Sequence, residues 1–274
     1  MKIDILTLFP EMCENYLSSS IVGRALRNDK VDVDVKCHNI RDYTLNKQKQ
    51  TDDAPFGGGQ GMVMYCQPIY DCFRAVCEQR GTRPHLIYMS PCGKVLTQQR
   101  VKELSELENI AILCGHYEGV DQRVIDEIVD EEISVGDYVV TGGELPALML
   151  TDAVMRMVPG VLAEEACYED ESHYSGLLEY PQYTRPYVWM DREVPEVLRS
   201  GHHANIMKWK LEQAEQRTRE RRPDMWEKYY AAKTAAEEAE KQRKREEKKA
   251  RREARKRAEA EAAAAAAAGE PSAE

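Results

Sequence analysis

The sequence lacks any hydrophobic run long enough to cross a membrane, and it lacks the cysteine spacing of a zinc site. No stretch approaches the ~18 apolar residues that a spanning helix needs. Met1–Asp4 has the alternating pattern of a strand and does not resemble the start of a signal peptide. The eight cysteines form no CxxC pair and several stand inside apolar runs. They indicate small buried side chains of a reducing compartment. We therefore expect a soluble cytoplasmic protein with no membrane contact and no metal site of its own.

Positive charge is outnumbered by negative charge. The 274 residues carry a net charge of −10, and residues 1–230 hold 26 basic against 38 acidic side chains. A generic nucleic-acid-binding protein is basic, so the composition argues against such a partner unless a local patch supplies the charge. Residues 199–222, with seven Lys or Arg against three Glu, form such a basic cluster. On the residues alone, a solvated helix face is the favoured explanation of this cluster.

Strand and helix patterns alternate through the first 162 residues. Strands are predicted where apolar residues alternate or run together, at Lys2–Phe9, Val31–Cys37, Pro84–Met89 and Ile110–Cys114. Helices are predicted where a capping residue or proline precedes helical periodicity, at Pro68–Gln79, Thr97–Leu107 and Glu144–Met157. This alternation predicts an α/β domain with a parallel sheet over residues 1–162.

The pattern changes after Pro159-Gly160. Residues 163–175 are mostly polar and lack periodicity, which predicts a flexible linker. Residues 176–230 are predicted to form a small helical domain, with Ala204–Arg221 as its clearest helix. Residues 231–274 consist almost entirely of Ala, Glu, Lys and Arg without an apolar stripe. They predict a solvated tail that is partly helical and then disordered.

Three glycine-bearing segments are candidates for a ligand site. Phe56–Met62 holds four glycines, Cys114–Arg123 follows a buried strand, and Ser134–Pro146 continues a strand through a double glycine into a helix. None has the spacing of a Walker loop or a dinucleotide fingerprint, which counts against a nucleotide-dependent oxidoreductase. Because ligands of open α/β sheets bind at the carboxyl ends of strands, we predict one shared pocket. His116 has no metal-type partner at helical spacing and is predicted to be a surface or loop histidine.

The three glycine-bearing segments, in the order in which they occur along the chain, resemble motifs of the bacterial tRNA (guanine-N1)-methyltransferases of the TrmD type. The motifs that carry the resemblance are Phe-Gly-Gly-Gly-Gln-Gly-Met, Gly-His-Tyr-Glu-Gly-Val-Asp-Gln-Arg and Ser-Val-Gly-Asp-Tyr-Val-Val-Thr-Gly-Gly-Glu-Leu-Pro-Ala, together with Leu8–Met12, Tyr183–Pro186 and Ser200–His203. The resemblance runs from residue 1 to about 223 and does not extend to the tail. It implies an α/β fold of the SPOUT class with a deep trefoil knot, and a homodimer whose active sites are shared between the subunits.

The resemblance also implies a reaction and its residues. The family transfers a methyl group from S-adenosyl-L-methionine to N1 of the guanosine 3′ of the anticodon in tRNA, and it is linked to magnesium. The matching positions that would bind the cofactor are Tyr88, Ser90, Pro91, Gly115, Tyr117, Glu118, Val135, Gly136, Asp137, Tyr138, Val139, Val140, Gly142, Gly143 and Pro146. For such a reaction, we expect His202, His203 and the basic cluster 199–222 to hold the anticodon stem, with Arg185 and Lys208 among the residues that bind the tRNA.

Asp170 and Arg156 match the family's catalytic pair. In neutral guanine N1 carries a proton, so a general base that removes it is worth about 10²–10⁴ in rate. The negative charge that develops on O6 can be stabilised by an arginine. The loop around Asp170 is one residue longer than in the family, which leaves Glu169 and Glu171 as alternative bases. An alternative from another class is a non-catalytic RNA-binding or assembly protein of the same fold.

Overall fold

The computed structural model describes residues 1–162 and 171–267. The chain divides into two compact units, Met1–Glu169 and Asp170–Glu274. The first unit is an α/β layer structure and the second is built mainly from helices. The parallel-sheet α/β fold with a helical C-terminal part is therefore confirmed. The trefoil knot and the domain boundaries at residues 162, 175 and 230 stay predictions.

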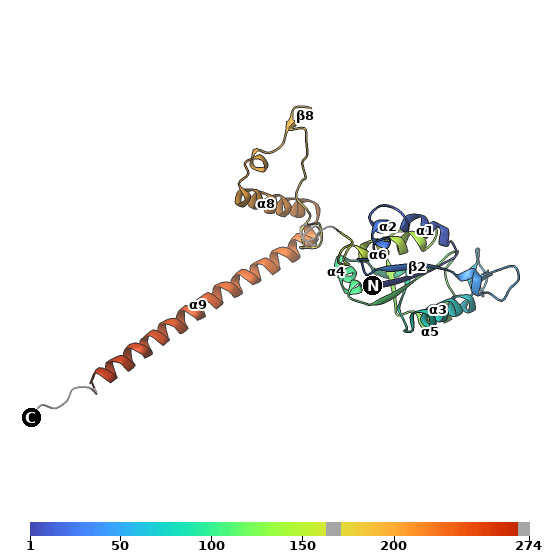
Figure 1. Cartoon of the computed structure of the whole chain (residues 1–274), viewed down its shortest axis with the longest axis horizontal. Coiled ribbons are helices and arrows are strands. Elements are labelled where there is room, and N and C mark those ends of the chain that lie inside the picture. Colours follow the sequence, from blue (N-terminus) through green and yellow to red (C-terminus); the bar gives the residue numbers. More distant parts are fainter. Residues whose placement is uncertain (163–170, 268–274) are drawn as a thin grey trace, which may run out of the picture. The chain divides into compact units, whose positions relative to one another are not determined.

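A parallel sheet between helices forms the middle of the first unit (Figure 1). It has five strands in the order β2-β1-β6-β5-β7. Its strands are β1 (Lys2–Thr7), β2 (Asp34–Asn39), β5 (His85–Val95), β6 (Asn109–Cys114) and β7 (Glu131–Ser134). The central strand β6 pairs with β1 on one side and with β5 on the other. Being covered on both faces, it is an almost continuous apolar run, as expected for a parallel sheet.

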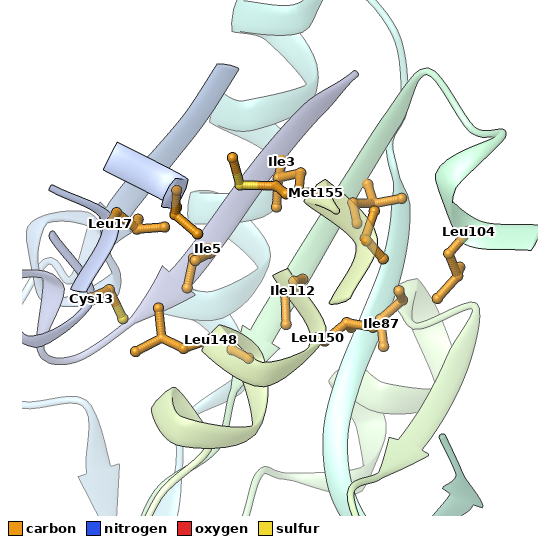
Figure 2. Close-up of a cluster of buried hydrophobic side chains, with 14 of the residues drawn as sticks. Ile3, Ile5, Cys13, Leu17, Ile87, Leu104, Ile112, Leu148, Leu150 and Met155 are labelled. Atoms are coloured by element: carbon orange, nitrogen blue, oxygen red, sulfur yellow. The ribbon is translucent and has the colours of Figure 1, made fainter. Parts of the chain in front are cut away.

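Helices cover both faces of this sheet. One face carries α1 (Pro10–Leu17), α2 (Ser20–Leu26), α4 (Gln98–Ser105) and α6 (Glu144–Met155), and the other carries α3 (Cys66–Arg80), α5 (Gln122–Ile128) and the 3₁₀ helix η1 (Ile40–Tyr43). Since side chains alternate along a strand, Ile3 and Ile5 meet the first helix layer while Leu6 meets the second. Figure 2 shows Cys13, Leu17 and Leu148 gathered around Ile5.

Several strands differ from their predicted bounds. β1 ends at Thr7 rather than Phe9, because α1 already begins at Pro10. β2 starts at Asp34 instead of Val31, because Asp34 pairs with Lys2 and β1 has no earlier residue in the ladder. β7 ends at Ser134, although the sequence predicts a strand that continues toward Gly142. The Ser134 hydroxyl donates to the Gly136 carbonyl at 2.9 Å, and the Gly136 N–H donates back to that hydroxyl at 3.1 Å. This local turn ends the strand and releases the following residues as a loop.

β5 is longer than its apolar core predicts. Met89 and Lys94 are both opposite Ile133 of β7, so the residues between them bulge out of the ladder. These residues, Ser90–Gly93, project at the edge where β6 ends. The bulge brings polar backbone to this edge, as bulges often do beside functional sites.

Small hairpins occupy the remaining loops. β3 (Asp52–Asp53) and β4 (Val63–Met64) flank the glycine-rich segment, and β8 (Val188–Trp189) pairs with β9 (Arg192–Glu193) in the second unit. A 3₁₀ helix, η2 (Glu196–Arg199), follows β9.

Two helices dominate the second unit, α8 (His203–Arg221) and α9 (Pro223–Ala267) (Figure 1). The predicted helix Ala204–Arg221 is confirmed. The start of α9 packs on α8, where Lys233 Nζ lies 2.5 Å from Glu215 Oε1. α9 then continues without a break to Ala267, so the tail is more regularly helical than predicted. Among the described residues, no helix is both long and apolar enough to cross a bilayer.

Candidate active site

A cavity of about 290 Å³ opens at the edge of the sheet where β6 and β7 end and β5 bulges. Its walls come from three short segments, at residues 88–92, 115–119 and 133–146. All but two of the fifteen residues that the resemblance assigns to the cofactor line this cavity. They are Tyr88, Ser90, Pro91, Gly115, Tyr117, Glu118, Val135, Tyr138, Val139, Val140, Gly142, Gly143 and Pro146. Gly136 and Asp137 belong to the same loop but do not line it.

Seven further residues of the wall are missing from the sequence-based set. They are Met89, Cys92, His116, Gly119, Ile133, Ser134 and Thr141. Most are immediate neighbours of predicted residues, so continuity of the segments was the available signal. Cys92 is exposed, which corrects the expectation that the cysteines are buried, whereas Cys13, Cys72 and Cys114 follow it. Burial raises the pKa of the Cys72 and Cys114 thiols well above its ordinary value.

Close backbone approach shapes the wall at Gly115 and Gly143. A Cβ on Gly143 would lie 2.6 Å from Cys114 Cα and 2.8 Å from Gly115 N. A Cβ on Gly115 would lie 2.8 Å from the hydroxyl of Tyr88, a side chain whose burial raises its pKa to about 12. Only glycine allows the Gly142-Gly143 turn to pack directly on the end of β6. The Gly143 N–H donates to the Gly115 carbonyl at 2.8 Å, which fixes this contact.

A buried polar cluster supports the same turn. Glu144, the first residue of α6, is only 2% exposed. Its carboxyl group accepts a hydrogen bond from the Thr7 hydroxyl at 2.7 Å and lies 2.8 Å from His116 Nε2. His116 lies in the loop after β6, as one form of the prediction has it, but it is not a surface side chain, since it is half-buried and bonded to a buried carboxyl group. The three side chains join the ends of β1 and β6 to the start of α6.

The glycine-rich segment Phe56–Met62 lies behind the wall rather than in it. The Glu118 N–H donates to the Met62 carbonyl at 3.0 Å, and a Cβ on Gly61 would lie 2.3 Å from the Glu118 carboxyl group. Gly61 has a φ of 85°, which favours glycine. The shared pocket is thus confirmed for the second and third glycine-bearing segments, while the first holds Glu118 from behind.

The structure describes only some of the predicted catalytic residues. Arg156 ends α6 as its C-cap and is half-buried, and its backbone N–H donates to Asp152 O at 3.0 Å. Asp170 and its alternative Glu169 lie outside the described residues, whereas Glu171 is described and half-buried. The roles of these residues therefore stay predictions.

The residues predicted to bind tRNA all lie in the second unit. Arg185, His202, His203 and Lys208 are exposed, with His202 as the N-cap of α8. Lys208 lies 3.8 Å from Glu212, one turn further along the helix.

The basic cluster 199–222 is not a simple solvated face. Arg199 stacks at 3.8 Å over the Tyr187 ring, and Lys210 and Arg219 lie similarly over aromatic rings. Arg217 donates to the Glu179 carbonyl at 3.0 Å. Cations over aromatic faces are attracted by the ring quadrupole. Much of this positive charge therefore stabilises the second unit itself.

No group of three or more His, Cys, Asp or Glu side chains within residues 1–162 and 171–267 is arranged to hold a metal ion.

Comparison with known proteins gives consistent matches. A family model described as tRNA (Guanine-1)-methyltransferase TrmD matches residues 1–228. A tRNA (guanine-N(1)-)-methyltransferase of Ruminiclostridium cellulolyticum is 58% identical over 228 residues, 83% of this chain and 97% of that protein. One of Alkaliphilus oremlandii is 51% identical over 238 residues, 85% and 95% of the two chains. The crystal structure of the tRNA (m1G37) methyltransferase from Aquifex aeolicus matches with a TM-score of 0.68 and 40% identity, covering 81% of this chain and 93% of that one.

Proposed function

Because this chain belongs to the tRNA (guanine-1)-methyltransferase family of the TrmD type, we propose that it transfers a methyl group from S-adenosyl-L-methionine to N1 of the guanosine immediately 3′ of the anticodon of tRNA. The observation that carries the proposal is the cavity at the carboxyl edge of the sheet. Its walls hold thirteen of the fifteen residues that the resemblance assigns to the cofactor. Ligands of open α/β sheets bind at this edge.

The walls fit a ligand that has both an apolar ring and polar groups. Val135, Val139 and Pro146 offer apolar surface, while Gly115 and Gly142 contribute backbone to the wall, because a Cβ on either would meet Tyr88 or His116. When bound, S-adenosyl-L-methionine supplies a methyl group on a sulfonium that is already an activated electrophile. The protein then has to bind and orient the methyl donor and to manage the proton of the guanine.

We assign the removal of that proton to Asp170, and the stabilisation of the negative charge on O6 to Arg156. Asp170→Asn keeps the size of the side chain but cannot accept the N1 proton. It should lower single-turnover methylation by about 10²-fold or more and leave the affinity for S-adenosyl-L-methionine intact. Glu169→Gln and Glu171→Gln are measured beside it. If Asp170→Asn stays active while one of these is dead, the base is that neighbour; if all three stay active, the base lies elsewhere.

The proposal includes a homodimer with shared active sites. Exposed apolar side chains on the neighbouring helices α1 and α6 support it, namely Met12, Tyr16, Leu145 and Met149. A mixture of inactive Arg156→Ala and Asp170→Ala proteins should regain activity if the two residues serve one site from different subunits. No recovery after verified subunit exchange would contradict sharing.

The deciding experiment incubates the purified protein with unmodified tRNA and labelled S-adenosyl-L-methionine, followed by mapping of the methylated nucleoside. We expect N1-methylguanosine 3′ of the anticodon. Tight tRNA binding without any methyl transfer would favour the alternative, a non-catalytic RNA-binding protein of this fold. The same assay with EDTA tests the magnesium dependence that the resemblance implies. With tRNA as substrate, we expect the reaction in the cytoplasm.

A further inference from the structure

Beyond the family match, which ends at residue 228, α9 carries an uneven arrangement of charge. Residues 241–257 hold eleven Lys or Arg and only three Glu. At 3.6 residues per turn, Arg245, Lys248 and Arg252 follow one another at spacings of three and four, so they share one exposed face. We call these three residues the basic stripe. The acidic side chains lie away from it around the helix: Glu246, Glu247 and Glu253.

The basic stripe is not neutralised within the helix. Three and four positions away from each of its residues stand only Lys, Arg or the neutral Gln. The like-charged pairs of Lys and Arg at these spacings disfavour the helix. Among the described residues, none of the three forms an ion pair. On the same stretch, Lys244 lies 2.6 Å from Glu240 and Arg243 lies 3.7 Å from Glu247. The stripe therefore holds positive charge that no acid in the described part of the helix offsets, whereas the charges of Arg243 and Lys244 are offset by Glu side chains.

This arrangement contrasts with the basic cluster 199–222 of the same unit. There, Arg199 and Arg219 stack on aromatic rings, and Arg222 lies 2.7 Å from Asp224. Those cations already have partners that stabilise the fold. The basic stripe is thus the stronger candidate for charge that is directed at another molecule.

We propose that the basic stripe is a phosphate-binding surface for RNA; that this RNA is the tRNA substrate rests on the proposed function. Its cations are spaced at about 4.5–6 Å along the helix, which presents a row of charge to a polyanionic backbone. A membrane surface fits less well, because a helix that lies on a bilayer needs an apolar face. From Ala231 onward the sequence has no Val, Leu, Ile, Met, Phe, Tyr or Trp. Since the stripe is on the same chain as the active site, its contacts add to the affinity for a shared RNA.

The test compares two triple variants of the full chain that lose the same charge. The triple variant Arg245→Gln, Lys248→Gln, Arg252→Gln removes the basic stripe. The control variant Arg243→Gln, Lys244→Gln, Lys249→Gln removes cations that have Glu three or four positions away. Binding of an unmodified tRNA transcript is measured between about 50 and 300 mM salt, because affinity that depends on phosphate contacts falls steeply over this range. Far-UV circular dichroism verifies that both variants keep the helix.

We expect the stripe variant to bind tRNA about tenfold more weakly at low salt, with a slope of log affinity against log salt reduced by about three. The control should stay close to the wild type. The charge-conserving variant Arg245→Lys, Lys248→Arg, Arg252→Lys should bind tRNA like the wild type. In methylation assays the stripe variant should raise KM for tRNA and leave kcat unchanged. Because binding is measured directly, failure of the wild type to methylate would refute the proposed function without deciding this inference.

Three results would overturn the inference. Unchanged tRNA binding in the stripe variant shows that the stripe does not contact RNA. An equal loss in both triple variants shows that net charge, and not the stripe, matters. Loss of binding to vesicles of phosphatidylserine and phosphatidylcholine, with tRNA binding intact, assigns the stripe to a membrane surface.

Discussion

The buried Glu144 joins the fold to the cavity, and its replacement gives the sharpest test of the site. Its carboxyl group accepts from Thr7 at 2.7 Å and lies 2.8 Å from His116 Nε2. Glu144→Ala leaves the fully buried Thr7 hydroxyl and the half-buried His116 ring without this group. Each buried polar group that loses its partner costs about 1–3 kcal/mol. We therefore expect the free energy of unfolding to fall by about 3 kcal/mol, taking the lower part of the summed range.

Glu144→Gln separates shape from hydrogen bonding. The amide oxygen can still accept from Thr7, so we expect a loss of only about 1 kcal/mol. Urea unfolding followed by far-UV circular dichroism measures both variants. Glu11 is the matched control, because it is also an acidic residue in the first turn of a helix but is exposed. Glu11→Ala should change stability by less than about 1 kcal/mol.

The same variants test the link to the cavity, whose wall includes His116 and Gly142. Glu144→Ala should weaken S-adenosyl-L-methionine binding about tenfold, or about 1.4 kcal/mol, as measured by isothermal titration calorimetry. A urea midpoint equal to that of the wild type would refute the stabilising role. Normal ligand affinity in a clearly destabilised variant would show that the cluster holds the fold but not the site.

Three further predictions follow from the structure. Asp4 is 1% exposed; burial alone would raise its pKa, but hydrogen bonds from His38 and Arg80 outweigh burial and hold the pKa below its ordinary value. The stability that it contributes is thus present above about pH 4 and is lost as the pH falls through the lowered pKa. Asp4→Asn should cost about 3 kcal/mol at pH 7, and the gap to the wild type should narrow in acid, as read from urea midpoints at several pH values; a constant gap contradicts the assignment. Gly143→Ala places a Cβ 2.6 Å from Cys114 Cα, in a strand that is paired on both sides. It should lower the free energy of unfolding by about 1–3 kcal/mol and weaken S-adenosyl-L-methionine binding as measured by calorimetry. Unchanged affinity would show that the turn can shift. A chain that ends at Ala235 keeps the Lys233–Glu215 contact and should retain the melting temperature within about 2 °C while losing RNA affinity; a large drop in melting temperature would show that the rest of α9 stabilises the fold.

The sequence predicts the elements of the sheet because their signals are local. The apolar run Ile110–Cys114 marks β6 whatever it pairs with, and Thr97 before its helix marks the cap, where its hydroxyl accepts from Arg100 N. The motifs around Gly115 and Gly142 indicate one pocket because the ends of parallel strands meet at one edge. The basic stripe is also present in the sequence, but the near-zero net charge of residues 231–274 conceals it until the helix assigns each cation to a face.

The partners of these residues were decided only by the tertiary structure. Thr7 and Glu144 are 137 positions apart, and no periodicity connects them. They meet because α6 packs on both β1 and β6, which are neighbours in the sheet. The same packing makes His116 a half-buried partner of Glu144, although its local sequence predicts only a surface or loop residue. Local patterns therefore determined which elements form, whereas the order of strands, which depends on contacts between distant residues, decided which side chains became a site.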